Sequence, residues 1–369
     1  MTTPQPNAQP AAIPVSGPKP VASPATSAGA GIVTKINLGS IRAKLAAKGA
    51  SGIKIYGRDE ISDALKRRVV GQDLACETID ELYAIGAARQ SSQTPVCVVF
   101  LAGPPGTGKS FIVENLHRFV SGESDLTSMI FIDGGKLKNP ELGMTQLFGA
   151  PKGYVGAEDG GQISRGLQNR ANSIILIDEF EKAHPSIQQS LLVALNSGFC
   201  DDLYNKTKIS TTKSAWFFTT NKNQKTLGPQ VSAMADKWAR SKVLRENYVA
   251  SDFLSPEFAD RVDIFLWLDR LKDDDQIVMI ANVVQEAIHR FDSRMSLADR
   301  GIEDEVVIDL YNQLQNLSDG TRELARIVKR TVQRDLLDMK RDGLDATKLR
   351  IVMRDGAVRA IPADIPTAT

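Results

Sequence analysis

The chain reads Leu101-Ala102-Gly103-Pro104-Pro105-Gly106-Thr107-Gly108-Lys109-Ser110 directly after the apolar run Val96–Leu101. The spacing Gly, four residues, Gly, Lys, Ser is typical of a loop that holds the phosphates of a nucleotide. A helical pattern, Phe111–Val120, follows at once, and a helix N-terminus favours an anion. A chance glycine-rich turn is the alternative, which this order of strand, loop and helix disfavours.

Each part of the loop has a predicted task in binding ATP and Mg²⁺. Gly103 and Gly108 allow backbone conformations in which successive N–H groups point at phosphate oxygens. Lys109 brings a positive charge to the β- and γ-phosphates, and Ser110 offers its hydroxyl to Mg²⁺. We therefore assign the eight residues from Gly103 to Ser110 to nucleotide binding.

Composition is that of an ordinary globular protein. The 369 residues are 42% hydrophobic and 24% charged, enough to build one large core or two modest ones. The net charge is +1 with acidic and basic residues interspersed, which disfavours a nucleic-acid partner. No apolar run approaches the roughly 20 residues that cross a bilayer, and no signal sequence is evident. We therefore expect a cytoplasmic protein without a membrane partner.

The three cysteines point to a reducing environment. Cys76, Cys97 and Cys200 are far apart, odd in number and without the spacing of a metal site. Cys97 lies within the apolar run before the glycine-rich loop. We expect it in the core.

The N-terminal region differs from the rest of the chain. Residues 1–31 contain seven prolines and one charge, at Lys19, which predicts a disordered tail. Residues 32–60 form a basic segment, in which Ile36, Ile41 and Leu45 could form a short amphipathic helix that ends at Gly49. Such a helix could cover the core or dock a partner.

From Ile61 onward, helices and apolar strands alternate, which is typical of an α/β fold whose parallel sheet is covered by helices on both faces. We assign 61–271 to this large domain, 272–361 to a small, mainly helical domain with a terminal hairpin, and 362–369 to a tail. The predicted strands are Val96–Leu101, Met129–Asp133, Ile174–Asp178, Ala215–Thr220 and Ile264–Leu268. The predicted later elements are helices Asp274–Phe291, Glu303–Leu317 and Thr321–Lys340, and a hairpin of Leu349–Met353 and Val358–Ile361.

Polar residues end two of these strands. Asp178 and Glu179 follow Ile174–Ile177, and at the sheet edge Asp178 would hold Mg²⁺ while Glu179 would polarise the water that attacks the γ-phosphate. The alternative is a surface Asp-Glu pair that merely closes a strand. Asn221 ends the next strand, where it could bind the attacking water or the γ-phosphate, or be an ordinary strand-ending asparagine.

Several motifs occur together in a known order. They are Val70-Gly71-Gln72-Asp73, the phosphate loop, Gly149-Ala150-Pro151-Lys152-Gly153-Tyr154-Val155-Gly156, Ile177-Asp178-Glu179-Phe180-Glu181-Lys182-Ala183-His184-Pro185, and Pro256-Glu257-Phe258-Ala259-Asp260-Arg261-Val262-Asp263. Over about 60–355 the chain resembles the Clp chaperone ATPases, and more narrowly the C-terminal ATPase ring of ClpA and ClpB, within the AAA+ superfamily. The resemblance implies an AAA+ P-loop fold with a five-stranded sheet and a small helical domain.

The same resemblance implies roles for individual residues. Val69 and Val70 would contact adenine, Asn221 would be the first sensor, and Arg322 would be the second sensor. Arg261 looks like the arginine finger that enters the neighbouring subunit's site, which implies a homo-oligomer, a hexameric ring in this family. From sequence alone, Arg261 could instead pair with Asp260 or Asp263.

One glycine-flanked loop suggests a function in addition to ATP hydrolysis. Gly153, Tyr154, Val155 and Gly156 form a glycine-flanked segment, and in Clp unfoldases the corresponding loop lines the pore and pulls on the substrate protein. Without the resemblance, Tyr154 could be a core anchor.

The chain also departs from the family pattern. It has one ATPase module, without a globular N-terminal domain or a long coiled coil, which argues against general disaggregation. The tripeptide that docks a ClpP peptidase is replaced by Leu227-Gly228-Pro229, which lacks the second apolar anchor, so a peptidase partner is disfavoured. Phe199 stands where the family usually has Arg, and Thr321 where it usually has Ala.

The leading hypothesis is an ATP-driven, ring-forming remodeller that threads a protein client. The second is an assembly switch or structural component that binds a partner without threading it. The third, an ATPase that moves nucleic acid, is disfavoured by the Clp-type motifs and the neutral charge.

Overall fold

The computed structural model describes residues 53–89, 93–123, 125–154, 157–316, 321–344 and 347–364. They belong to one compact unit that begins at Ile53. The predictions for residues 1–52, including the tail and the amphipathic helix, lie outside the described residues. Within the described ranges, every helix is too short or too polar to span a lipid bilayer.

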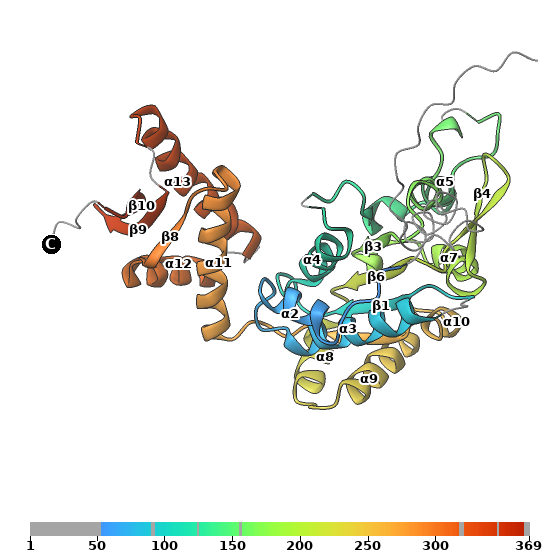
Figure 1. Ribbon diagram of the computed structural model, residues 1–369. Coiled ribbons are helices and arrows are strands. Elements are labelled where there is room, and N and C mark those ends of the chain that lie inside the picture. Colours follow the sequence, from blue (N-terminus) through green and yellow to red (C-terminus); the bar gives the residue numbers. More distant parts are fainter. Residues whose placement is uncertain are drawn as a thin grey trace, which may run out of the picture. The chain divides into compact units, whose positions relative to one another are not determined.

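A five-stranded parallel sheet forms the centre of the larger part (Figure 1). Its strand order is β2-β3-β6-β1-β7, and each neighbouring pair is parallel. The strands are β1 Cys97–Ala102, β2 Ile130–Asp133, β3 Ile174–Asp178, β6 Ala215–Thr220 and β7 Ile264–Trp267. All five predicted strands and their parallel arrangement are therefore confirmed.

Helices cover both faces of this sheet because its strands are apolar on both sides. Val98 and Phe100 of β1 lie in one hydrophobic cluster, while Val99 and Leu101 lie in the other. The helices that contribute to the second cluster are α2 Glu60–Lys66, α3 Asp73–Ala88 and α4 Lys109–Ser121. Those of the first cluster are α5 Pro140–Phe148, α6 Gln162–Asn169, α7 Ser186–Asn196, α8 Gln224–Ser232, α9 Lys237–Ala250 and α10 Pro256–Ala259.

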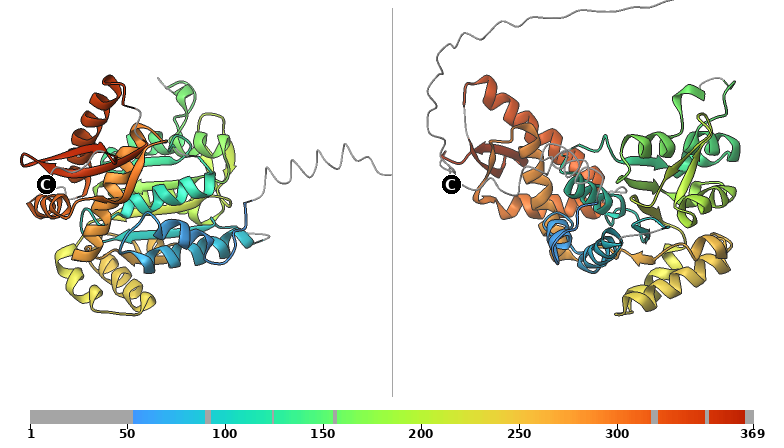
Figure 2. Two further views of the ribbon diagram at one scale, coloured as in Figure 1. Left: turned by 60° about the vertical axis from the view of Figure 1, so that its left-hand side comes forward. Right: turned by 45° about the vertical axis from the view of Figure 1, so that its right-hand side comes forward.

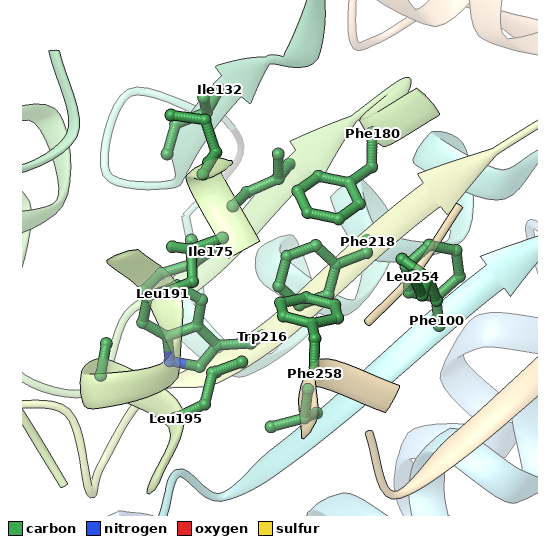
Figure 3. Close-up of a cluster of buried hydrophobic side chains, with 14 of the residues drawn as sticks. Phe100, Ile132, Ile175, Phe180, Leu191, Leu195, Trp216, Phe218, Leu254 and Phe258 are labelled. Atoms are coloured by element: carbon green, nitrogen blue, oxygen red, sulfur yellow. The ribbon is translucent and has the colours of Figure 1, made fainter. Parts of the chain in front are cut away.

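Aromatic rings fill the middle of the first cluster (Figure 3). The Phe180 ring stacks on Phe258 with a centroid distance of 5.3 Å, and Phe218 meets both rings edge to face. Phe180 lies two residues after the end of β3, and Phe258 lies in α10. The packing therefore joins the carboxyl end of β3 to the segment that precedes Arg261.

The structure adds an antiparallel hairpin that the sequence did not predict, β4 Phe199–Asp202 with β5 Thr207–Ser210. Its strands are short and largely polar, so they lack the apolar runs by which the other strands were found. Buried Asp202 holds the turn, because its carboxylate accepts from the Tyr204 N–H, 3.0 Å, and from Asn205 Nδ2, 2.6 Å.

The C-terminal part has its own hydrophobic cluster. Its helices are α11 Asp273–Phe291, α12 Asp304–Asn316 and α13 Thr321–Arg341, and its strands are β8 Ser296–Ile302, β9 Lys348–Arg354 and β10 Ala357–Pro362. The predicted helices and hairpin are confirmed, whereas β8 was missed because its irregular pairing with β9 breaks the alternation of apolar residues. Asp335 of α13 accepts from the Ala360 N–H, 2.8 Å, which fixes the helix against the hairpin (Figure 2). The division into domains 61–271 and 272–361 stays a prediction.

The predicted basic segment 32–60 includes Tyr56, which belongs to the second hydrophobic cluster. Tyr56 is buried, packs against Tyr83 and Phe119, and donates from its hydroxyl to the Val120 carbonyl, 3.1 Å. Tyr56 therefore joins this part of the segment to α3 and to the end of α4, and the division at residue 60 stays a prediction.

Candidate functional site

The phosphate loop connects the end of β1 to the start of α4. Gly103 has φ +144°, and a Cβ on it would lie 2.3 Å from the Leu268 carbonyl, so only glycine fits. Gly108, with φ +90°, precedes the first residue of α4. The first turn of α4 carries no acidic side chain, and no side chain caps it, which leaves its N–H groups available to an anion.

Lys109 is buried at the centre of the site. Its Nζ donates to the carbonyl oxygens of Gly103, 2.9 Å, and Pro104, 2.7 Å. It also donates to Oδ1 of Asn221, 2.7 Å, at the end of β6. Burial lowers the pKa of Lys109 to about 8, against the opposing charges of Glu181 and Asp178. A buried cation among acceptors suits the neutralisation of phosphate charge.

Ser110 and Asp178 lie together, as predicted. The Ser110 hydroxyl donates to Oδ1 of Asp178, 2.7 Å, and so does the Thr219 hydroxyl, 2.5 Å. Hydroxyl and carboxylate oxygens are the hard ligands that Mg²⁺ prefers, so these residues fit that ion. Thr219, which the sequence analysis passed over, orients the carboxylate from the neighbouring strand.

Glu179 has an unusual backbone. Its φ is +54° and its ψ +49°, a left-handed conformation that is rare outside glycine and is often found at functional sites. The Glu179 N–H donates to Oγ1 of Thr219, 2.9 Å, and its carboxylate accepts from Lys182 Nζ, 2.6 Å. Thr219 thus holds the backbone of Glu179, while Lys182 binds its carboxylate.

A second glutamate also reaches the site. Glu181, in the short helix η4 Phe180–Lys182, accepts the backbone N–H of Asn221 at Oε1, 3.1 Å. Glu181 belongs to the motif Ile177–Pro185, and no role for it was predicted from the sequence. No local signal could have paired it with Asn221, because the two belong to different strand ends.

The segment predicted to contact adenine is tied to the phosphate loop. Val69 is buried and Val70 partly buried, between α2 and α3. Buried Gln72 donates from Nε2 to the carbonyls of Thr107, 3.3 Å, and Asp269, 2.8 Å. The sequence analysis gave Gln72 no task, yet it is the link that fixes this segment beside the loop.

Residues at the start of α13 reach the loop. The Thr321 hydroxyl donates to the Gly106 carbonyl, at a long 3.5 Å. Burial lowers the pKa of Lys109, and the charge of exposed Arg322 lowers it further, so the guanidinium lies within electrostatic range of Lys109. This placement suits a second sensor, a role that stays a prediction.

Arg261 does not make the ion pairs that sequence left open. Asp260 pairs with Arg245, and Asp263 accepts the Val98 N–H, 2.7 Å. The Arg261 side chain is exposed, and within the described part of the chain its guanidinium has no ion pair or hydrogen bond. It is therefore available to another molecule.

The loop expected to hold clients follows α5. Tyr154 is 68% exposed, so the alternative of a core anchor is wrong. Gly153 has φ +105°, and Val155 and Gly156 lie outside the described residues. Lys152 Nζ lies 5.1 Å from the centre of the Tyr204 ring, which brings the loop beside the hairpin of β4 and β5.

The tripeptide Leu227-Gly228-Pro229 is part of α8. Leu227 is 1% exposed and belongs to the first hydrophobic cluster. Gly228 lies against Trp267. An apolar anchor buried in the core cannot also dock a partner. Phe199, the other departure, lies under Lys208 Nζ, 4.0 Å from the ring centre.

The chain is similar in sequence to known proteins. Residues 94–265 match the family model described as AAA domain (Cdc48 subfamily). The chain is 27% identical over 292 residues to the ATP-dependent Clp protease ATP-binding subunit ClpC of Staphylococcus epidermidis, covering 77% of this chain and 35% of the relative. It is 29% identical over 286 residues to the chaperone protein ClpB of Bdellovibrio bacteriovorus, with 75% and 31% covered. It is 30% identical over 285 residues to the ClpE subunit of Lactococcus lactis, with 75% and 36% covered. The chain spans about a third of the length of these relatives.

Proposed function

The chain belongs to the Clp family of AAA+ ATPases, and from this premise we propose that it is an ATP-hydrolysing, ring-forming remodeller that threads a protein client through a central pore. The proposed ATPase activity is supported by the ends of β1, β3 and β6, which lie together at the phosphate loop. There Lys109 donates a hydrogen bond to Asn221 and Ser110 donates one to Asp178, each at 2.7 Å.

The residues of this site have complementary tasks in hydrolysis. Lys109 and the N-terminus of α4 hold the phosphates. Ser110 and Asp178 would hold Mg²⁺, which when bound neutralises charge on the phosphate oxygens. Glu179 takes the proton of the attacking water, and Asn221 orients that water.

The proposal that the protein forms a ring rests on Arg261. A permanently charged guanidinium with a planar fork of donors suits developing phosphate charge. Its exposure, with Asp260 and Asp263 bound elsewhere, supports a task in the neighbouring subunit's site. We infer a homo-oligomer, a hexamer as in the family pattern, that acts in the cytoplasm without a peptidase partner.

Tyr154 is the residue that we propose contacts the client protein. A large amphipathic ring on an exposed loop contacts a polypeptide without reading its sequence. The alternative is a switch that binds a partner and changes state, for which Tyr154 would not be required. The two functions therefore differ in what they demand of this one side chain.

The variants Tyr154→Ala and Tyr154→Phe distinguish threading of a client from the switch. Clients are first identified as proteins retained by the Glu179→Gln variant with ATP. Threading predicts that Tyr154→Ala stops unfolding of such a client while ATP hydrolysis stays within about three-fold, and that Tyr154→Phe, which keeps the ring, retains most unfolding. Full output from Tyr154→Ala would favour the switch.

A further inference from the structure

Glu181 holds a buried oxygen that no hydrogen bond satisfies. Oε1 of its carboxylate accepts the Asn221 N–H, 3.1 Å, whereas Oε2 is buried without a partner. Among the described side chains, one other buried polar atom shares this state, the hydroxyl of Tyr248 in α9. Burial raises the pKa of Tyr248 and the charge of Glu181 raises it further, so the two unsatisfied atoms lie in one region of the protein.

An unsatisfied buried carboxylate oxygen lowers stability, so its presence needs an explanation. Packing does not supply one. Phe180 next to it fills the aromatic cluster, and an apolar side chain at 181 would leave no oxygen unsatisfied. A residue that lowers stability at the edge of an active site is typical of function.

Hydrogen bonds connect Glu181 through Asn221 to Lys109 in the nucleotide site. Its Oε1 fixes the backbone of Asn221, whose Oδ1 accepts from Lys109 Nζ, 2.7 Å. The N–H of Asn221 follows the last residue of β6, so sheet pairing does not hold it there. The Glu181 carboxylate accepts this N–H in place of a neighbouring strand. It thereby fixes the position of the Asn221 backbone, from which the side chain extends.

We propose that Glu181 is a positioning residue for ATP hydrolysis, which acts by holding the Asn221 main chain so that the asparagine side chain stays beside Lys109 and the γ-phosphate. This inference rests on the proposed ATPase function. Glu181 touches no reacting atom. The effect of its hydrogen bond passes through Asn221, whereas its charge acts on Lys109 directly.

Two neutral variants of equal length isolate the hydrogen bond. Glu181→Gln keeps an oxygen acceptor for the Asn221 N–H, and Glu181→Met has none. Both remove the charge, so a difference between them reports the acceptor alone. Glu286→Met is the control, because Glu286 forms an ion pair with Arg290 on the surface of α11.

The measurements are kcat and KM for ATP and the thermal midpoint of the full chain. We expect kcat of Glu181→Met to be at least about 10-fold below that of Glu181→Gln, with KM within about three-fold. Thermal midpoints well above the assay temperature check that both variants are folded, because Glu181→Met leaves the Asn221 N–H without an acceptor. In an Asn221→Ala background the two variants should hydrolyse ATP equally, because Glu181 then has no side chain to position.

Equal kcat for the Gln and Met variants would overturn the proposal, as would an undiminished difference in the Asn221→Ala background. Should Glu181→Met fail to fold, Glu181→Ala makes the same comparison, because it also lacks an acceptor and adds no bulk. An unmodified chain without ATP hydrolysis would instead contradict the proposed function itself, so the two failures are distinguishable.

Discussion

Lys109 and Asn221 are 112 positions apart in the chain, yet a hydrogen bond of 2.7 Å joins Nζ of one to Oδ1 of the other. This bond connects the residue that follows the phosphate loop with the end of β6. Binding of a γ-phosphate would give Lys109 a charged partner in addition to the amide.

Lys109 and Glu179 should affect different steps. Lys109→Ala removes the buried charge from the phosphate cradle and should weaken nucleotide binding. Glu179→Gln keeps nearly the same shape, so it should spare binding and lower turnover by at least about 100-fold. Titration with fluorescent ATP and steady-state phosphate release check both, with exposed Lys242→Ala as the control. A Glu179→Gln protein with normal turnover would remove the role given to Glu179.

Arg261 should act on the neighbouring subunit. Turnover per chain should rise with protein concentration, because one chain completes another's site. Mixing Arg261→Ala chains with Glu179→Gln chains should restore part of the activity, since some interfaces then pair an intact arginine with an intact glutamate. Arg290→Ala, an exposed arginine on α11, should have no effect on turnover. Absence of recovery in rings shown to be mixed would argue against action between subunits.

The N-terminal segment should choose the client. Deleting residues 1–52 should leave ATP turnover within a few-fold but abolish client capture by Glu179→Gln, as expected if a tethered segment carries the contact. Deleting 1–56 also removes Tyr56, which packs on Tyr83 and Phe119, and should lower the thermal midpoint. Co-purification and thermal unfolding of both truncated proteins check this. Unchanged capture after deletion of 1–52 would place recognition in the ATPase body.

His117 should make stability depend on pH. It is buried in α4, where desolvation lowers its pKa and its ring nitrogen lies 3.1 Å from the Ser128 hydroxyl. As the pH falls below about 6.5, the unfolded chain takes up the proton first, so the free energy of unfolding decreases until the folded pKa is passed.

Replacing His117 by glutamine, which stays neutral, should reduce this loss. Urea unfolding of both proteins between pH 7.5 and pH 5.5 measures it. Parallel pH profiles for the two proteins would show that His117 is not the group responsible.

Local patterns in the sequence were enough for most of the fold. The five strands of the main sheet are apolar runs bounded by polar or glycine residues, and β3 and β6 have the predicted bounds. The β4–β5 hairpin was missed because the side chain of Asp202 stabilises its turn. Strand β8 was missed because it depends on its pairing with β9. Such long-range or side-chain support leaves no periodic signal.

The sequence by itself determined the residues for which a chemical role is predicted: the phosphate loop, the Asp178-Glu179 pair, Asn221 at the end of a strand, and the loop at Tyr154. Only the tertiary structure decided which of them meet. β6 follows β3 in the chain but lies between β3 and β1 in the sheet, and this order brings Asn221 to Lys109. Burial likewise decided that Tyr154 is exposed and Leu227 is not. The physical reason is that strand order and burial depend on how distant segments pack, whereas a motif records only neighbours along the chain.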